Sequence, residues 1–377
     1  MKYRHFDKLG IDVSVFGLGC MRLPMIEKDG KKIVDREISD RIIREAIEGG
    51  VNYFDTAYVY SEQDNEAALA HALRGGLREK VYIATKLPIF KCESSEDFER
   101  MFCEQLERLE TDHIDFYLVH SLSGEQWDKA VSLGICEFLD KLKREGRIRY
   151  ACFSFHDDYA AFERIIKAYD WDMCQIQFNY MDVENQAGVK GLRLAGELGI
   201  PVVIMEGLRG GRLATVPSEV REVFDSYNEH RTDVEWAFKF IADFQEVMTI
   251  LSGVTDTEQL HDNIRIFSEL TANSMTNEEH DIIKRAADAY MKRIKVGCTG
   301  CKYCMPCPNG VSIPDIFTTW NNAFRYGTTL GGNQRYARMK NQGNGADKCI
   351  QCGACEGACP QHINIIEMLR VADSELS

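Results

Sequence analysis

Short apolar runs alternate with amphipathic stretches from Val13 to about Leu270. A short apolar run bounded by polar residues or glycine is typical of a strand buried on both faces. Such runs predict eight strands, at Val15–Gly19, Asn52–Asp55, Val81–Thr85, Ile114–His120, Ile148–Ser154, Met173–Phe178, Val202–Met205 and Val247–Ser252.

The stretches between these runs place apolar residues at helical spacing. Asp35–Glu48 has apolar residues along one helix face and ends at a pair of glycines. The other helices predicted in this part are Ser94–Leu109, Trp127–Glu145, Asp158–Tyr169, Asp233–Asp243 and Thr257–Leu270. Eight strand–helix units predict an α/β fold, a (β/α)8 TIM barrel. The rival, a doubly wound sheet, would carry Gly-x-Gly-x-x-Gly after its first strand, and Phe16-Gly-Leu-Gly-Cys-Met lacks the third glycine.

The remainder of the chain has a different composition. Asn277–Ile294 predicts a charged helix, and a cysteine-rich region with helices at Ile313–Tyr326 and Asn333–Lys340 follows it. We therefore predict a barrel over residues 1–275, a connecting helix over 276–296 and a small C-terminal α-helical, ferredoxin-like iron–sulfur domain over 297–377.

Eight of the 14 cysteines form two tight runs in this last domain. Three cysteines at x2 spacing wrap three corners of an iron–sulfur cube, and a fourth before proline usually ligates the other cluster. Zinc sites more often use paired Cys-x2-Cys, and disulfides need an oxidising compartment. We predict two 4Fe–4S clusters, one held by Cys298, Cys301, Cys304 and Cys359, the other by Cys349, Cys352, Cys355 and Cys307.

Composition narrows the class of protein further. The net charge of -14 disfavours nucleic acid and anionic membrane surfaces as partners. Residues 1–12 have no apolar signal region, and no apolar run is long enough to span a bilayer. We expect a soluble, cytoplasmic protein.

Four polar residues stand where predicted strands end, which is the catalytic face of a barrel. Asp55 ends one strand and Tyr60 follows five residues later, while Lys86 directly follows the next strand and His120 ends the one after it. Singly, each is more often a cap, a packing ring, a solvated amine or a core imidazole. Together they predict a device for carbonyl reduction, in which Tyr60 supplies a proton, Lys86 lowers its pKa and is held by Asp55, and His120 orients the carbonyl.

The motifs around these residues resemble those of the aldo/keto reductases. The resemblance covers about residues 1–270, and the whole chain is similar to the branch with a C-terminal ferredoxin-type domain. It implies an Asp–Tyr–Lys–His tetrad and carbonyl reduction by a nicotinamide cofactor bound across the barrel mouth. The motifs are Val13-Ser-Val-Phe-Gly-Leu-Gly-Cys-Met-Arg-Leu, Asn52-Tyr-Phe-Asp-Thr-Ala-Tyr-Val-Tyr, Ala84-Thr-Lys and Leu118-Val-His.

The resemblance also suggests cofactor contacts. Phe155 stands where the family usually has Asn, so one amide contact is missing. No Lys or Arg matches the family's 2′-phosphate site, although Arg209 or Arg212 could replace them, and the cofactor is NADP or NAD. The candidate cofactor residues are Cys20, Met21, Ser154, Gln175, Gly207, Leu208, Gly253, Thr255, Gln259 and Asn263. Most cysteines outside the two runs are expected to be small buried hydrophobes. Cys20 ends the first strand and should line the cofactor mouth, but packing is the role that we expect for it too.

Three hypotheses for function stay open. The first is an NAD(P)H-dependent reductase of a small aldehyde or ketone, with clusters that transfer electrons or stabilise structure. Since a hydride carries two electrons and a cluster moves one, the second is a reductase that passes single electrons from a ferredoxin-like partner to a barrel-bound substrate or flavin. The third is a non-catalytic module for redox sensing or electron shuttling.

Overall fold

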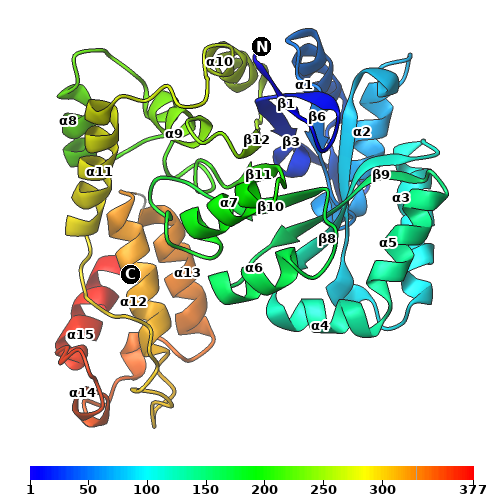
Figure 1. Cartoon of the computed structure of the whole chain (residues 1–377). Coiled ribbons are helices and arrows are strands. Elements are labelled where there is room, and N and C mark those ends of the chain that lie inside the picture. The colour runs from blue at the N-terminus through cyan, green and yellow to red at the C-terminus, as the bar shows by residue number, and fades with distance from the viewer. Residues whose placement is uncertain (328) are drawn as a thin grey trace. The chain divides into compact units, whose positions relative to one another are not determined.

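The structure is a computed structural model and describes residues 1–327 and 329–377. Figure 1 shows strands gathered in one region and helices around them. The strands are β1 (Tyr3–Phe6), β2 (Ile11–Ser14), β3 (Phe16–Gly19), β4 (Met25–Lys28), β5 (Lys31–Val34), β6 (Tyr53–Asp55), β7 (Tyr82–Leu87), β8 (Ile114–Leu122), β9 (Ile148–Phe155), β10 (Met173–Gln177), β11 (Val202–Met205) and β12 (Val247–Ser252).

The helices mostly follow the strands of the first part of the chain, and the last four of them follow residue 312. They are α1 (Arg36–Glu48), α2 (Asn65–Leu73), α3 (Glu96–Leu109), α4 (Gly124–Ser132), α5 (Ile135–Arg144), α6 (Tyr159–Ile166), α7 (Gly188–Glu197), α8 (Ser218–Asp225), α9 (Asp233–Ala242), α10 (Thr257–Phe267), α11 (Asn277–Lys292), α12 (Ile313–Arg325), α13 (Thr329–Asn341), α14 (Ala354–Gly357) and α15 (Ile365–Leu376).

The barrel is a closed ring of parallel strands in the order β10-β11-β12-β3-β6-β7-β8-β9. The predicted (β/α)8 fold is therefore confirmed, and each of its eight predicted strands is a barrel strand. Their residues are almost fully buried, because the barrel core covers one face of each strand and the helices cover the other. The hairpins β1–β2 and β4–β5 were not predicted.

One helix prediction was wrong, and the sequence pattern did not predict helices α2, α7, α8, α14 and α15. The stretch Trp127–Glu145 is two helices, α4 and α5, because Gly134 takes a left-handed φ of 82° at the start of α5. Helix α2 was missed because nearly all its residues are buried, so it lacks the polar face that marks an amphipathic helix.

The chain divides into two compact units. One comprises residues 1–210 and 235–276, and the other comprises residues 211–234 together with 277–377. Within the second unit α8 packs against α11, and Arg293 Nη1 lies 2.5 Å from Glu219 Oε1. The predicted end of the barrel at 275 lies next to the division after residue 276, whereas no division falls at 296 and the segment 211–234 of the barrel sequence belongs to the C-terminal unit.

The second unit has its own apolar core. Trp320 and Phe317 of α12, Tyr336 of α13 and Leu369 of α15 are buried in it, and six of the eight clustered cysteines pack against its edge. The core thus supports the two cysteine-rich loops. Across the described residues, no helix combines the length and the apolar character that crossing a membrane requires.

Candidate active site and metal centres

Three adjacent barrel strands bring the four tetrad residues together. Asp55 ends β6, Lys86 lies in β7 and His120 lies in β8, and these strands are neighbours in the ring. Tyr60 begins a short 3-10 turn, Tyr60–Gln63, after β6. The four side chains therefore reach the same sector of the barrel's carboxyl end, where barrel enzymes carry their chemistry.

Lys86 is the centre of this group. Its Nζ donates to Asp55 Oδ1 at 2.6 Å, to the Thr56 carbonyl at 2.8 Å and to the Tyr60 hydroxyl at 3.3 Å. Burial opposes the charge, but Asp55 and then Tyr60 raise the pKa of Lys86 above its ordinary value. A buried ammonium with three acceptors therefore stays protonated at neutral pH.

Tyr60 differs from the expectation in one respect. Burial is the largest influence and raises the pKa of its phenol, while Lys86 lowers it and Asp55 raises it again. The net direction is upward, so Lys86 limits the rise in pKa instead of producing a net decrease. A phenol in this state keeps its proton at neutral pH and is ready to donate it.

His120 is neutral in this environment. Burial, then Lys86 and His156, lower its pKa to about 3. Its ring lies 6.1 Å from the Tyr60 ring and 5.8 Å from the Phe90 ring, centroid to centroid. Its Nδ1 is buried and has no hydrogen-bond partner among the described residues. A neutral imidazole beside the phenol has one N–H to offer a carbonyl oxygen.

The other five strands of the ring carry the candidate cofactor residues. Ser154 of β9 pairs in register with Gln175 of β10, and Gln175 Nε2 contacts Met205 Sδ of β11 at 3.7 Å. Gln175 is 2% exposed, and its Oε1 has no partner in the described part of the chain. A buried, unsatisfied acceptor is costly, which suits a site that receives an amide N–H from a ligand.

Gly253, directly after β12, lies against Arg22 beyond β3. A Cβ at Gly253 would stand 2.8 Å from Arg22 Cγ, so a side chain there would displace the arginine. Arg22 Nη2 also lies 3.7 Å from the position of a Cβ on Gly210. Arg22 was missed in the sequence, although a basic residue just beyond the first strand is a signal that could have identified it. An exposed guanidinium at this end of the barrel suits the phosphates of a dinucleotide.

The remaining candidate cofactor residues are less distinctive. Cys20 is buried beside the tetrad and Met21 is 52% exposed, while Gly207 and Leu208 follow β11. Thr255 and Gln259 bond to each other at the start of α10. Asn263 Nδ2 donates to Ser252 Oγ at 3.0 Å. The structure therefore gives Thr255, Gln259 and Asn263 partners within the protein, and their contact with a cofactor stays a prediction.

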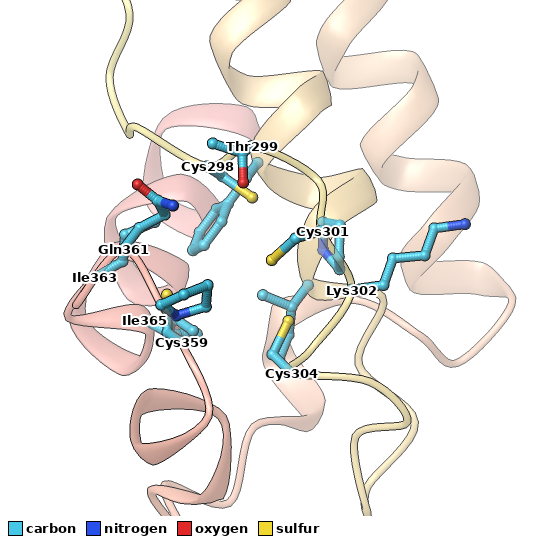
Figure 2. Close-up of a pocket in the computed structure, with 13 residues that line it drawn as sticks. Cys298, Thr299, Cys301, Lys302, Cys304, Cys359, Gln361, Ile363 and Ile365 are labelled. Atoms are coloured by element: carbon cyan, nitrogen blue, oxygen red, sulfur yellow. The ribbon is translucent and has the colours of Figure 1, made fainter.

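The first cysteine-rich site is a small cavity. Figure 2 shows Cys298, Cys301 and Cys304 on the loop after α11 and Cys359 on the segment before α15, around one space. Apolar side chains such as Phe317 complete the lining. Four thiols around one apolar cavity are the donor set that a 4Fe–4S cluster requires.

The second site has the same form. A small cavity is lined by Cys307, Cys349, Cys352 and Cys355. The two cavities therefore group the eight cysteines in the two sets that the spacing predicts, with Cys307 and Cys359 exchanged between the runs. Within the described residues, no three His, Cys, Asp or Glu side chains are close enough to hold a single metal ion.

Residues 16–286 match the aldo/keto reductase family, and residues 297–364 match a 4Fe-4S dicluster domain. The fold and these matches define an oxidoreductase barrel joined to an iron–sulfur domain, and the chain belongs to the aldo/keto reductase family. A probable aldo-keto reductase 1 of Glycine max is 34% identical over 158 residues, which is 37% of this chain and 41% of that protein. The chain thus matches less than half the length of this relative.

Solved structures share the barrel. Aldo-keto reductase AKR11C1 from Bacillus halodurans, in its holo form, is 26% identical with a TM-score of 0.63, covering 77% of this chain and 97% of that one. The thermostable aldo-keto reductase Tm1743, in complex with the inhibitor epalrestat, is 20% identical with a TM-score of 0.62, covering 76% and 100%. The second likeness concerns the fold alone.

Proposed function

We propose that the barrel reduces an aldehyde or ketone to an alcohol with NAD(P)H, with Tyr60 as proton donor. The observation that carries this proposal is the contact of Lys86 Nζ with both Asp55 and the Tyr60 hydroxyl in a buried site. When bound, the nicotinamide would supply a hydride to the carbonyl carbon. Tyr60 gives its proton to the carbonyl oxygen, and Lys86 stabilises the phenolate that remains.

The other residues hold the reactants. Neutral His120 donates an N–H to the carbonyl oxygen and polarises it as charge develops there. Gln175, with its unpartnered buried Oε1, and Ser154 would hold the carboxamide of the cofactor, and Arg22 its phosphates. The choice between NADP and NAD stays open, as does the identity of the carbonyl substrate.

The test is the substitution Tyr60→Phe in the full-length, cluster-loaded protein. Anaerobic oxidation of NADPH or NADH in the presence of a panel of aldehydes and ketones is expected to fall at least about 100-fold, while cofactor binding persists. Tyr58→Phe is the matched control, because Tyr58 stands in the same loop and donates to Glu104 instead. Equal turnover by the two variants would show that Tyr60 is not the proton donor and would contradict the proposed catalytic role of the tetrad.

The iron–sulfur domain supports a second candidate function. Cys301 and Cys352 are exposed, one at each cavity, and Tyr303 and Ile350 beside them are 70% and 63% exposed. Exposed ligands with neighbouring apolar side chains suit electron entry from a ferredoxin-like partner. Under this candidate, clusters reduced with dithionite would reduce a barrel-bound substrate or flavin without nicotinamide. Absence of such turnover, with NAD(P)H-driven turnover intact, favours the first function.

A further inference from the structure

The turn that follows Tyr60 has an unusual backbone. Ser61, Glu62 and Gln63 have φ values of 47°, 55° and 74°, so three consecutive residues other than glycine are left-handed. Each such residue carries a cost in free energy, because its Cβ approaches backbone oxygen. This conformation persists only where surrounding contacts stabilise it, and it stands directly beside the proposed proton donor.

Asn65, at the start of α2, supplies such contacts. Its side chain is fully buried, and its Nδ2 donates to Ser61 Oγ at 3.1 Å and to the Cys20 carbonyl at 2.9 Å. Its Oδ1 accepts from Thr56 Oγ1 at 2.7 Å. A carbonyl can only accept, so the contact with Cys20 fixes the orientation of the amide. Both N–H groups and the oxygen of this one amide are therefore used.

The three partners of Asn65 are each next to a residue of the site. Thr56 follows Asp55, and its carbonyl accepts from Lys86 Nζ at 2.8 Å. Ser61 follows Tyr60, and Cys20 follows β3 directly and begins the short turn that contains Met21 and Arg22. The buried side-chain amide of Asn65 thus connects Thr56, which follows Asp55 and accepts a hydrogen bond from Lys86, with the turn that follows Tyr60.

We propose that Asn65 is a positioning residue, which holds the turn after Tyr60 and so keeps the Tyr60 hydroxyl beside Lys86. This inference rests on the proposed function of Tyr60. Asn65 itself touches no reacting atom, and it acts through Ser61 and Thr56. The groups that face Tyr60 are Lys86, Asp55, Cys20 and His120, of which only Lys86 brings positive charge to the phenol.

The test compares Asn65→Leu with Asn52→Leu in the full-length, cluster-loaded protein. Leucine keeps the branching and the number of heavy atoms of the asparagine side chain, with somewhat larger volume, and removes its hydrogen bonds. Asn52 is the matched control, since it binds Ser14 N and the Asp12 carbonyl below β6, at the opposite end of the same strand. Both variants lose side-chain hydrogen bonds, largely buried at Asn65 and part-buried or exposed at Asn52, but only Asn65 contacts the turn after Tyr60.

For Asn65→Leu we expect kcat to fall about 10- to 100-fold with KM for the carbonyl changed little, as for a misplaced catalytic group. The alkaline limb of the kcat profile should move to higher pH, because a phenol farther from Lys86 holds its proton more tightly. Asn52→Leu should leave that limb in place. NADPH binding, measured by fluorescence titration, should be the same in both variants.

A second substitution keeps the inference testable if Asn65→Leu does not fold. Ser61→Ala removes only the hydroxyl that Asn65 binds, and it should shift the alkaline limb in the same direction by less. An unchanged limb in the folded variants, with Tyr60→Phe inactive, would overturn the positioning role and leave the proposed function intact. An active Tyr60→Phe variant would instead reject the proposed function on which this inference rests.

Discussion

Replacing Lys86 by Met should destabilise the barrel strongly, because it leaves a buried carboxylate without its partner. Lys86 is 1% exposed and Asp55 is 3% exposed. Their charged atoms are 2.6 Å apart, which corresponds to a gross attraction of about 6 kcal/mol at an effective dielectric constant of about 20. Desolvation of both charges opposes this attraction. Breaking such a buried pair by removing one partner costs about 3–5 kcal/mol.

The expected loss is a large share of the free energy of unfolding, which is about 5–15 kcal/mol for ordinary domains. Urea unfolding followed by circular dichroism, under anaerobic conditions, measures it. The matched control is Lys141→Met, because Lys141 pairs with Glu99 at 2.9 Å on the surface, with side chains 46% and 39% exposed. That pair should contribute no more than about 1 kcal/mol.

A double variant separates charge burial from lost packing. Asp55→Leu/Lys86→Met removes both charges, so it should recover most of the stability that Lys86→Met loses. It should remain inactive, since no ammonium is left beside Tyr60. The reasoning fails if Lys86→Met loses no more stability than Lys141→Met, or if the double variant is less stable than the single one.

Three further predictions follow from the same geometry. The pKa of His120 is about 3 in the folded protein and about 6.5 in the unfolded chain, so the unfolded state binds an extra proton and the free energy of unfolding decreases as the pH falls below 6.5. In urea unfolding, His120→Asn should therefore lose about 1 kcal/mol less stability than the parent protein between pH 7 and pH 5.5. Cys359→Ser should lower iron from about eight to about four per chain, and adding Cys301→Ser, from the same cavity, should lower it no further. Arg22→Ala should weaken NADPH binding about tenfold in a fluorescence titration, more at low salt than at high salt, whereas Arg41→Ala on α1 should not.

The barrel was predictable because its strands carry a strong local signal. Both faces of each strand are covered, so each reads as an apolar run, and the ends of those runs placed Asp55, Lys86 and His120 at one face of the fold. Helix α2 gave no such signal because it is buried almost on all sides. The helical break at Gly134 depends on a backbone conformation that the apolar pattern does not record.

The finer parts of the site depend on contacts between distant residues. Asn65 meets the Cys20 carbonyl across 45 positions of sequence, and no spacing rule connects them. The pKa of Tyr60 depends on the balance between its burial and a neighbouring charge, and the sequence shows only the charge. The grouping of Cys359 with Cys298 could be foreseen, because it follows from the chemistry of a repeated ligand motif.

The segment 211–234 has a consequence for the engineering of this chain. It leaves the barrel sequence after β11, belongs to the compact unit of the cysteine-rich region, and returns to the barrel at α9. A gene cut at residue 276 would leave α8 without α11, its packing partner. The unit that holds the cysteine-rich loops therefore comes from two separate stretches of sequence, and transplanting it to another barrel requires both stretches to be moved together.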